Sequence, residues 1–203
     1  MRVRFGTLLV DAVRFDEALA RIEGLVDSRA GGVVFTPNVD HVVVADREPR
    51  LSAAYARCEL SLADGTPLVW TSGLLGLRLP EKVSGSDVLR PVFALAERRK
   101  YRVYLLGAAP GVVEEAAVQL KKEYGLEVCG LDSPRVSLGA SLDFYVGRVR
   151  RAPRWMQRTG LEWLYRLLQE PRRLAKRYLV DDVRFLAIFA RTLRLPRAER
   201  VVP

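Results

Sequence analysis

The chain is poor in the residues that build disulfides, zinc sites and hydrolase triads. Its 203 residues contain two cysteines, Cys58 and Cys129, which form no C-x-x-C pair. We therefore expect neither a disulfide framework nor a zinc site, but two reduced thiols in a cytosolic protein. The only histidine is His41, and no serine lies in a G-x-S-x-G turn. A Ser-His-Asp triad has no support, and a lone histidine after a strand is more often structural than catalytic.

Long hydrophobic runs are also missing. No stretch of 18 or more consecutive apolar residues occurs, so the sequence predicts no membrane-spanning helix. The basic start MRVRF leads into a very short apolar stretch that Asp11 interrupts, unlike a signal peptide. From these absences we expect a cytoplasmic protein.

Positive charge is present in excess, and all of the excess lies near the end of the chain. Residues 1–147 contain 18 lysines and arginines against 19 acidic residues, whereas residues 148–203 contain 15 against 5. Such a block is typical of a surface that meets an anionic partner: nucleic acid, anionic lipid or a phosphorylated substrate. The alternative is a well-solvated helical face without a partner.

Strands alternate with helices through the first 132 residues. Apolar runs and helical periodicity predict strands at 31–35, 58–65, 101–107 and 126–132, and helices at 15–26, 40–56, 86–100 and 108–124. This alternation indicates a mostly parallel sheet with helices on both faces. We therefore expect an α/β, Rossmann-like domain over residues 1–147, followed by a basic helical appendage over residues 148–203.

Small polar residues follow the predicted strands, where an open α/β sheet binds its ligands. The segments are FTPN (35–38), ADGT (63–66), LLGAAPG (105–111) and GLDS (130–133). FTPN is either the start of a helix or part of a substrate pocket. Asp64 is either a general base or the N-cap of a helix that begins near Thr66.

The glycine turn after residue 106 is a candidate phosphate site. Gly107 opens a turn that leads into a helix, whose backbone N–H groups and dipole favour an anion. The turn lacks the full G-x-G-x-x-G spacing, and many such turns bind nothing. Asp132, about 25 residues further along, is a candidate for contact with a ribose.

Five segments, in this order, resemble the WecG/TagA/CpsF family of bacterial glycosyltransferases. They are FTPNVDHVVVADREP, LSLADGTPLVW, LPEKVSGSDVL, VYLLGAAPGVVEEAA and RAPRWMQRTGLEWLYRLLQEPRRLAKRYL. The resemblance implies an inverting hexosyltransferase that needs no metal or other cofactor. It implies transfer of N-acetylmannosamine, or a related sugar, from a UDP donor to undecaprenyl-diphosphate-linked N-acetylglucosamine. Such a reaction serves the synthesis of teichoic acid or another cell-envelope polysaccharide.

The resemblance also implies roles for individual residues. Thr36 and Asn38 match the family's T-P-N motif at the donor, and Asp64 matches the aspartate of its A-D-G motif, the expected catalytic base. Lys82 stands where family members commonly have arginine, so the charge is kept but the bidentate fork is lost. Asp64 would deprotonate the acceptor hydroxyl, while Lys82 and the turn at Gly107 would hold the departing diphosphate.

One family segment has no counterpart in this chain. The family has a further strand–helix unit with a G-x-P-K-Q-E motif between the segments that match GLDSP and GASLDF. Here only a few residues join them, too few for the crossover between parallel neighbours. GASLDF therefore pairs antiparallel, lies outside the sheet, or follows a sheet that lacks one unit. Because the motif's glutamine and glutamate are absent, the alternative function is a shortened, non-catalytic UDP- or lipid-binding member.

Residues 171–179 predict a basic amphipathic helix that begins at Pro171. One face carries Arg172, Arg173, Lys176 and Arg177, and the other carries Leu174, Tyr178 and Leu179. Such a helix lies in a membrane interface and attracts anionic lipid headgroups. The alternative is a helix packed on the body through its apolar face. The resemblance places Arg166, Arg173 and Lys176 where basic residues complete the active site at the membrane.

These features together predict a peripheral protein on the inner face of the cell membrane, with a UDP-sugar and a lipid diphosphate as substrates. Binding of nucleic acid through the basic tail is disfavoured because the sequence has no aromatic-rich sheet face. Assembly into a homo-oligomer is compatible with the sequence, which specifies no oligomeric state.

Overall fold

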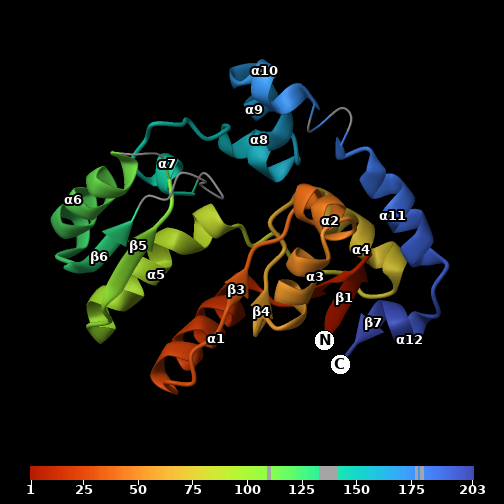
Figure 1. Cartoon of the computed structure of the whole chain (residues 1–203), viewed down its shortest axis with the longest axis horizontal. Helices are drawn as coiled ribbons and strands as arrows, with labels where there is room; N and C mark the ends of the chain where they lie inside the picture. Colours follow the sequence, from red (N-terminus) through yellow and green to blue (C-terminus); the bar gives the residue numbers. More distant parts are fainter. Residues whose placement is uncertain (109–110, 133–140, 177, 179–180) are drawn as a thin grey trace. The chain divides into compact units, whose positions relative to one another are not determined.

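A computed structural model describes residues 1–108, 111–132, 141–176, 178 and 181–203 of the chain. The chain forms two compact units, of which residues 1–84 and 152–203 make the first and residues 85–151 the second. Both chain ends therefore belong to the first unit, as Figure 1 shows. This division differs from the predicted boundary after residue 147, because the end of the chain returns to the first unit.

The elements alternate much as the sequence predicts. The first unit contains β1 (Arg2–Phe5), β2 (Leu8–Asp11), α1 (Phe15–Asp27), β3 (Val34–Phe35), α2 (Val39–Ala45), α3 (Pro49–Ala56), β4 (Leu60–Ser61), α4 (Thr66–Ser72), the 3₁₀ helix η1 (Gly73–Leu75), α8 (Arg154–Arg158), α9 (Glu162–Gln169), α10 (Pro171–Lys176), α11 (Arg184–Leu193), α12 (Arg197–Arg200) and β7 (Val201–Val202). The second contains α5 (Gly85–Arg99), β5 (Val103–Leu106), α6 (Val112–Tyr124), β6 (Val128–Asp132) and α7 (Ser141–Tyr145). Every strand and helix predicted up to residue 132 has a counterpart in the described residues, but β3 and β4 are only two residues long and Pro49 divides the predicted 40–56 helix into α2 and α3.

The described strands of the first unit form two small sheets. β1 pairs antiparallel with both β2 and β7, and β3 pairs parallel with β4. The β1–β2 hairpin, which the sequence reading did not predict, turns at Gly6 with φ of 61°. A side chain at Gly6 would also meet Ile188 of α11, because a Cβ there would lie 2.7 Å from its Cγ2.

The end of the chain is part of the core of the first unit. Phe185 and Ile188 of α11 are buried in one cluster with Phe5 of β1 and Val42 of α2. The Gly6 backbone N–H donates to the Thr192 hydroxyl at 3.0 Å. The prediction of a separate appendage over residues 148–203 is therefore wrong for the α11–β7 region, whose apolar side chains complete this core.

The second unit is a parallel β5–β6 pair packed against helices. Leu105 is buried with Phe93 of α5 and Leu120 of α6, whereas Tyr104 and Leu106 are 57% and 66% exposed. Alternate side chains of β5 thus face opposite sides, and the helical side is the buried one. Figure 1 shows β5, β6, α5 and α6 in the green part of the chain.

The segment whose pairing was uncertain is a helix. Residues 141–145 form α7, and Tyr145 packs edge-on against Phe93 with ring centroids 5.3 Å apart. The second of the three alternatives, a segment outside the sheet, is therefore confirmed for these residues, while the junction 133–140 lies outside the described part. The mixed α/β class is confirmed. However, the described parallel pairs do not join into the single Rossmann-like sheet that was predicted.

Candidate active site

Three backbone segments of the first unit lie side by side where β3 and β4 end. The Leu62 N–H donates to the Phe35 carbonyl at 2.8 Å, and the Asp64 N–H donates to the Pro37 carbonyl at 2.8 Å. On the other side of this segment, the Val83 N–H donates to the Ala63 carbonyl at 2.9 Å. Parallel pairing thus continues past the strands and brings the T-P-N segment, the A-D-G segment and Val83 to one edge.

Asp64 does not occupy the N-cap position of the helix that follows it. α4 begins at Thr66, and its N-cap position is occupied by Gly65, which has no side chain to form a cap hydrogen bond. The capping alternative for Asp64 is therefore wrong, although the helix begins where the sequence predicts. The carboxylate is partly exposed at the carboxyl end of β4, and its charge is felt by the buried phenol of Tyr55.

Asn38 is both a motif residue and a helix cap. Its Oδ1 accepts a hydrogen bond from the His41 backbone N–H at 3.1 Å at the start of α2. The helix-start interpretation of FTPN is thus confirmed, but it leaves the amide NH₂ as the group of Asn38 that can donate to a ligand. Gly65 lies against Asn38, because a Cβ on Gly65 would be 3.8 Å from the Asn38 Cβ. Thr36, at the end of β3, is partly exposed.

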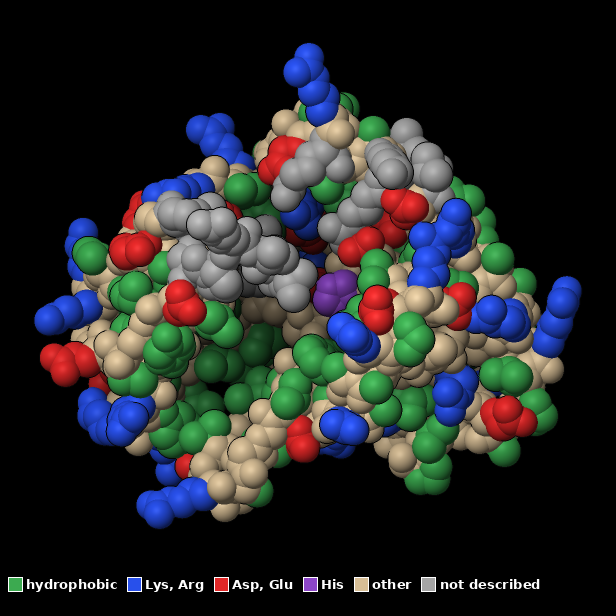
Figure 2. All heavy atoms as spheres, viewed as in Figure 1, with side chains coloured by type: hydrophobic (Ala, Val, Ile, Leu, Met, Phe, Trp, Pro, Cys, Tyr) green, Lys and Arg blue, Asp and Glu red, His purple; other side chains and the backbone are tan. Residues whose placement is uncertain are grey.

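The imidazole of His41 is tied to Tyr55 of α3. Nδ1 of His41 and the Tyr55 hydroxyl are 2.6 Å apart, and the two rings meet edge-on. Burial, with smaller contributions from Cys58 and Asp64, raises the pKa of the Tyr55 phenol well above its usual range. Tyr55 is 3% exposed, whereas His41 is partly exposed and can be seen, in purple, at the surface in Figure 2.

Lys82 is held by the C-terminal part of the same unit. Its Nζ lies 3.2 Å from Oε2 of Glu162, the first residue of α9, and both side chains are largely buried. Arg166 is four residues further along α9 and therefore shares a helix face with Glu162. Glu162 and Tyr55 were not predicted from the sequence, because the residues around them do not indicate that they contact Lys82 and His41.

The second unit holds the other two predicted nucleotide contacts. The Gly107 N–H donates to the Asp132 carbonyl at 3.0 Å, so both residues lie at the carboxyl edge of the β5–β6 sheet. Gly107 has φ of 111°, a conformation that favours glycine. α6 follows and begins at Val112, with Gly111 at its N-cap. The glycine turn and Asp132 thus have the relation that a parallel pair predicts.

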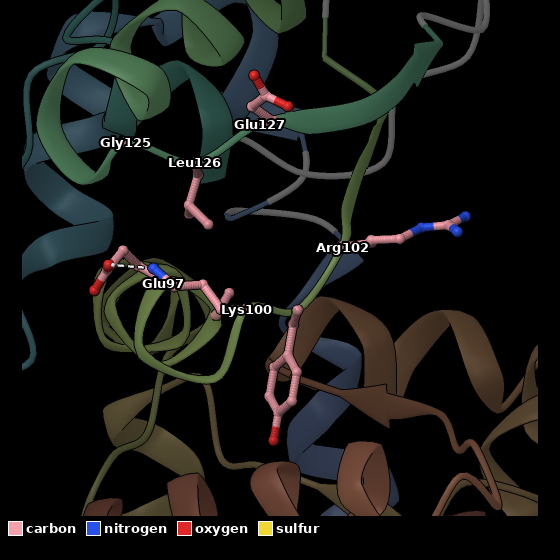
Figure 3. A pocket seen from close by; sticks show the side chains of 8 residues that line it. Glu97, Lys100, Arg102, Gly125, Leu126 and Glu127 are labelled. Atoms are coloured by element: carbon pink, nitrogen blue, oxygen red, sulfur yellow. Dashed lines mark hydrogen bonds and ion pairs between the residues drawn. The ribbon is translucent and has the colours of Figure 1, made fainter.

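A hollow in the second unit lies at the opposite edge of that sheet. Figure 3 shows its lining, which includes Arg102 and Glu127, the residues that precede β5 and β6. Its volume of about 250 Å³ is below the roughly 300–1,000 Å³ of typical ligand pockets. Glu97 and Lys100 also neutralise each other at 2.9 Å. The hollow is therefore not the ligand crevice that the strand ends predict.

The match to known proteins follows the same motifs. The sequence model of the glycosyl transferase WecG/TagA/CpsF family matches residues 3–138 and 135–199 of the chain. The chain belongs to this family. The resemblance read from the motifs is thus confirmed, and the two matched stretches meet at residues 135–138, where the G-x-P-K-Q-E segment was expected.

Two curated relatives of this WecG/TagA/CpsF family member carry one name, N-acetylglucosaminyldiphosphoundecaprenol N-acetyl-beta-D-mannosaminyltransferase. The protein from Bacillus spizizenii (strain W23) is 28% identical over 193 residues, covering 73% of this chain and 75% of the relative. The protein from Bacillus subtilis (strain 168) is 25% identical over 191 residues, covering 72% and 75%.

The predicted amphipathic helix is partly packed within this family member. α10 ends at Lys176; Leu174 is 2% exposed, and Tyr178 meets the Trp163 ring edge-on at 6.0 Å. The packed-helix alternative is therefore correct for these two apolar residues. Arg172 is exposed. Of the remaining predicted basic residues, Arg173 and Lys176 lie in α10 and Arg177 lies outside the described part.

The basic block also supplies contacts within each unit. The arginines with such contacts include Arg148 to Glu115, Arg151 to Asp87, Arg191 to Asp46, Arg197 to the Gly76 carbonyl and Arg200 to the Leu74 carbonyl. On the face shown in Figure 2, lysines and arginines are spread out, with acidic side chains among them. Not all of the positive excess is therefore available to an anionic partner.

The described residues contain neither a membrane-spanning helix nor a metal-binding cluster. None of their helices is both long enough and apolar enough to cross a bilayer. No group of three or more His, Cys, Asp or Glu side chains in this part of the chain is arranged to hold a metal ion. Whether the reaction is metal-independent stays a prediction of the family resemblance.

Proposed function

We propose that the chain is an inverting glycosyltransferase that transfers N-acetylmannosamine, or a related sugar, from a UDP donor to undecaprenyl-diphosphate-linked N-acetylglucosamine. The names of the two relatives support the sugar and the acceptor. The observation that carries the proposal is the hydrogen bond from the Asp64 N–H to the Pro37 carbonyl, which aligns the two motif segments at one sheet edge. A base and a ligand-binding amide are thereby neighbours.

Asp64 is the proposed general base. Its carboxylate takes the proton of the acceptor hydroxyl while the hydroxyl oxygen bonds to the anomeric carbon of the donor sugar. The bond from that carbon to the diphosphate breaks at the same time, and UDP leaves with the electron pair. Attack opposite the leaving group inverts the anomeric configuration.

Lys82 and Asn38 are the proposed partners of the donor in the first unit. The Lys82 ammonium would offset the charge of the departing diphosphate, and the Asn38 amide and Thr36 hydroxyl would hydrogen-bond to the donor. Glu162 keeps the ammonium within 3.2 Å of its carboxylate before a ligand arrives. Gly107 and Asp132 remain predicted contacts to the nucleotide, for a phosphate and the ribose respectively.

The proposed binding to the membrane rests on apolar residues other than those that the sequence predicted. Leu174 is buried and Tyr178 packs against Trp163, but Trp155, Leu168 and Leu186 are 60%, 72% and 65% exposed. Together with the exposed arginines of the same region, these side chains suit an anionic membrane interface. We therefore propose peripheral binding to the inner face of the membrane, with Arg166, Arg173 and Lys176 near the lipid diphosphate.

A non-catalytic UDP- or lipid-binding member is the second candidate. The alignment to the Bacillus spizizenii relative runs over 193 residues, which is more than 73% of this chain, so part of the relative stands opposite gaps. This supports the absence of an internal segment here. Without the glutamine and glutamate of the family motif, binding of UDP would persist while transfer is lost.

The rate of sugar transfer by the Asp64→Asn variant tests the proposal directly. We expect the parent to convert UDP-N-acetylmannosamine and a lipid-diphosphate N-acetylglucosamine, and the variant to be slower by about 10²–10⁴-fold, because a general base contributes that much. Product is measured by mass spectrometry, and UDP affinity by calorimetry is expected to stay close to that of the parent. Asp16→Asn is the matched control, because it makes the same change from carboxylate to amide at an exposed position of α1.

The outcomes separate the two candidates. A variant as active as the parent would remove Asp64 from the mechanism. A parent that binds UDP but shows no turnover supports the non-catalytic alternative. A parent that neither binds UDP nor transfers sugar contradicts both.

A further inference from the structure

Beside the T-P-N segment, the partly exposed His41 contacts the buried Tyr55, and neither residue has a role in the motif assignments. The His41 backbone N–H donates to the Asn38 side chain at 3.1 Å, so the backbone of His41 is held in the first turn of α2. Its Nδ1 lies 2.6 Å from the Tyr55 hydroxyl. The Tyr55 ring packs against Phe35, the residue directly before Thr36, with the ring centroids 4.4 Å apart and the ring planes tilted by 34°. The two residues therefore lie next to the T-P-N motif.

The surroundings of Tyr55 decide where the proton of this hydrogen bond lies. A phenol that is 3% exposed must give its hydrogen to an acceptor, and the His41 Nδ1 is the partner at hydrogen-bond distance. Burial and the negative charge of Asp64 both oppose loss of that hydrogen. When Nδ1 accepts, a neutral imidazole carries its own hydrogen on Nε2.

We propose that Tyr55 fixes His41 as the Nε2–H tautomer and that this N–H donates a hydrogen bond to an oxygen of the nucleotide sugar. His41 would then be a substrate-binding residue and Tyr55 its positioning residue. The identity of the ligand rests on the function proposed above, whereas the tautomer does not.

The tautomer can be read directly, because His41 is the only histidine of the chain. In a long-range ¹H–¹⁵N spectrum of uniformly labelled, tag-free protein near neutral pH, the ring signals therefore come from one residue. We expect the pattern of a neutral imidazole protonated at Nε2, and a mixture of tautomers in Tyr55→Phe, which keeps the ring but lacks the hydroxyl. An Nδ1–H tautomer or an imidazolium in the parent overturns the proposal.

A matched control removes a buried phenol elsewhere. Tyr145 of the second unit is also buried, and its hydroxyl donates to Glu123 at 3.2 Å. Tyr145→Phe is expected to leave both His41 ring signals unchanged. If it alters them as much as Tyr55→Phe does, the tautomer reports general stability and not the contact with Tyr55, and the positioning role is refuted.

Titration with ligands tests the contact. UDP is added first and UDP-N-acetylmannosamine second. A shift of the Nε2 signal with UDP indicates that the N–H binds an oxygen of the nucleotide. A shift only with UDP-N-acetylmannosamine indicates that it binds an oxygen of the sugar. Either result supports the contact. An unmoved signal with a ligand that calorimetry shows to bind overturns it and leaves the proposed function intact. If neither ligand binds, the proposed function and the contact both fail, while the spectrum of the free protein still decides the tautomer.

Two substitutions distinguish the ring nitrogens in a binding assay. The amide nitrogen of glutamine extends about as far as Nε2, whereas that of asparagine extends only about as far as Nδ1. We expect His41→Gln to bind the ligand within about twofold of the parent, and His41→Asn to bind it about three- to tenfold more weakly, as for one lost hydrogen bond. Equal affinities for all three proteins contradict the contact.

Discussion

At the scale of single residues, one side chain can serve both the fold and the ligand. Asn38 caps α2 through Oδ1, which the helix-start interpretation requires, and its backbone lies at the edge shared with Asp64, where we propose that its amide NH₂ binds the ligand. The helix-start and substrate-pocket interpretations of FTPN do not exclude each other, because they use different atoms of the Asn38 side chain. Separating them requires substitutions that change one atom of the side chain and keep the other.

Asn38→Asp and Asn38→Ala make this separation. Aspartate keeps the capping oxygen, so we expect unfolding free energy within about 0.5 kcal/mol of the parent, whereas alanine loses about 1 kcal/mol with the cap. Both variants lose the amide donor and are expected to bind UDP at least threefold more weakly. Urea unfolding measures the first property and calorimetry the second. Parental UDP affinity in both would leave Asn38 with a structural role only.

Thr36→Val tests the neighbouring motif residue. Valine keeps the branched shape but lacks the hydroxyl, so we expect UDP-sugar affinity to fall by about two- to tenfold, with little change in stability at this partly exposed position. The measurement is calorimetry with UDP-N-acetylmannosamine. An unchanged affinity would remove Thr36 from the donor contacts.

At the scale of elements, a buried carboxylate joins the hairpin to the sheet that carries the site. Asp11, at the end of β2, is 5% exposed and accepts hydrogen bonds from Arg2 at 3.2 Å and Arg21 at 3.3 Å. Its other oxygen accepts from the Ser61 N–H of β4 at 2.9 Å. The position of β4, and with it that of the Asp64 segment, therefore depends on a residue far from the motif.

Asp11→Ala is expected to destabilise the first unit. The change leaves the buried Ser61 N–H without its acceptor, and an unmade buried hydrogen bond costs about 1–3 kcal/mol. Asp11→Asn keeps an acceptor oxygen for that N–H, so we expect it to lose less. Urea denaturation measures both, with Arg21→Ala as a control, since this arginine is half exposed and its ion pair contributes little. A parental midpoint for Asp11→Ala would contradict the role of Asp11 in holding β4.

At the scale of the whole molecule, the last residues of the chain both complete the hydrophobic core of the first unit and carry the exposed side chains that are proposed to bind the membrane. α11 buries Phe185 and Ile188 beside β1, and β7 closes the sheet against β1. A chain shortened before α11 would lose these groups, so truncation is not a clean test of membrane binding. Point substitutions of exposed side chains are needed instead.

Liposome sedimentation with such variants tests the membrane surface. We expect the parent to bind anionic vesicles, less so at high salt, and Trp155→Ser with Leu168→Ser to weaken binding at least tenfold, because burying one such side chain contributes roughly 1.5–3 kcal/mol. Val118→Ser, at a 71% exposed position of the second unit, is the matched control. Equal sedimentation of the double variant and the parent would refute this surface.

Local patterns in the sequence determined the elements and the family. Strand and helix alternation, the T-P-N and A-D-G motifs and the glycine turn at Gly107 are short-range signals, and each was found where it was predicted. Only the tertiary structure decided that Gly65 and not Asp64 caps α4, that Glu162 meets Lys82, and that α11 belongs to the core. These facts depend on which distant residues come into contact. Helical periodicity identifies an apolar face, such as that of Leu174, but whether protein or lipid covers it is decided by packing.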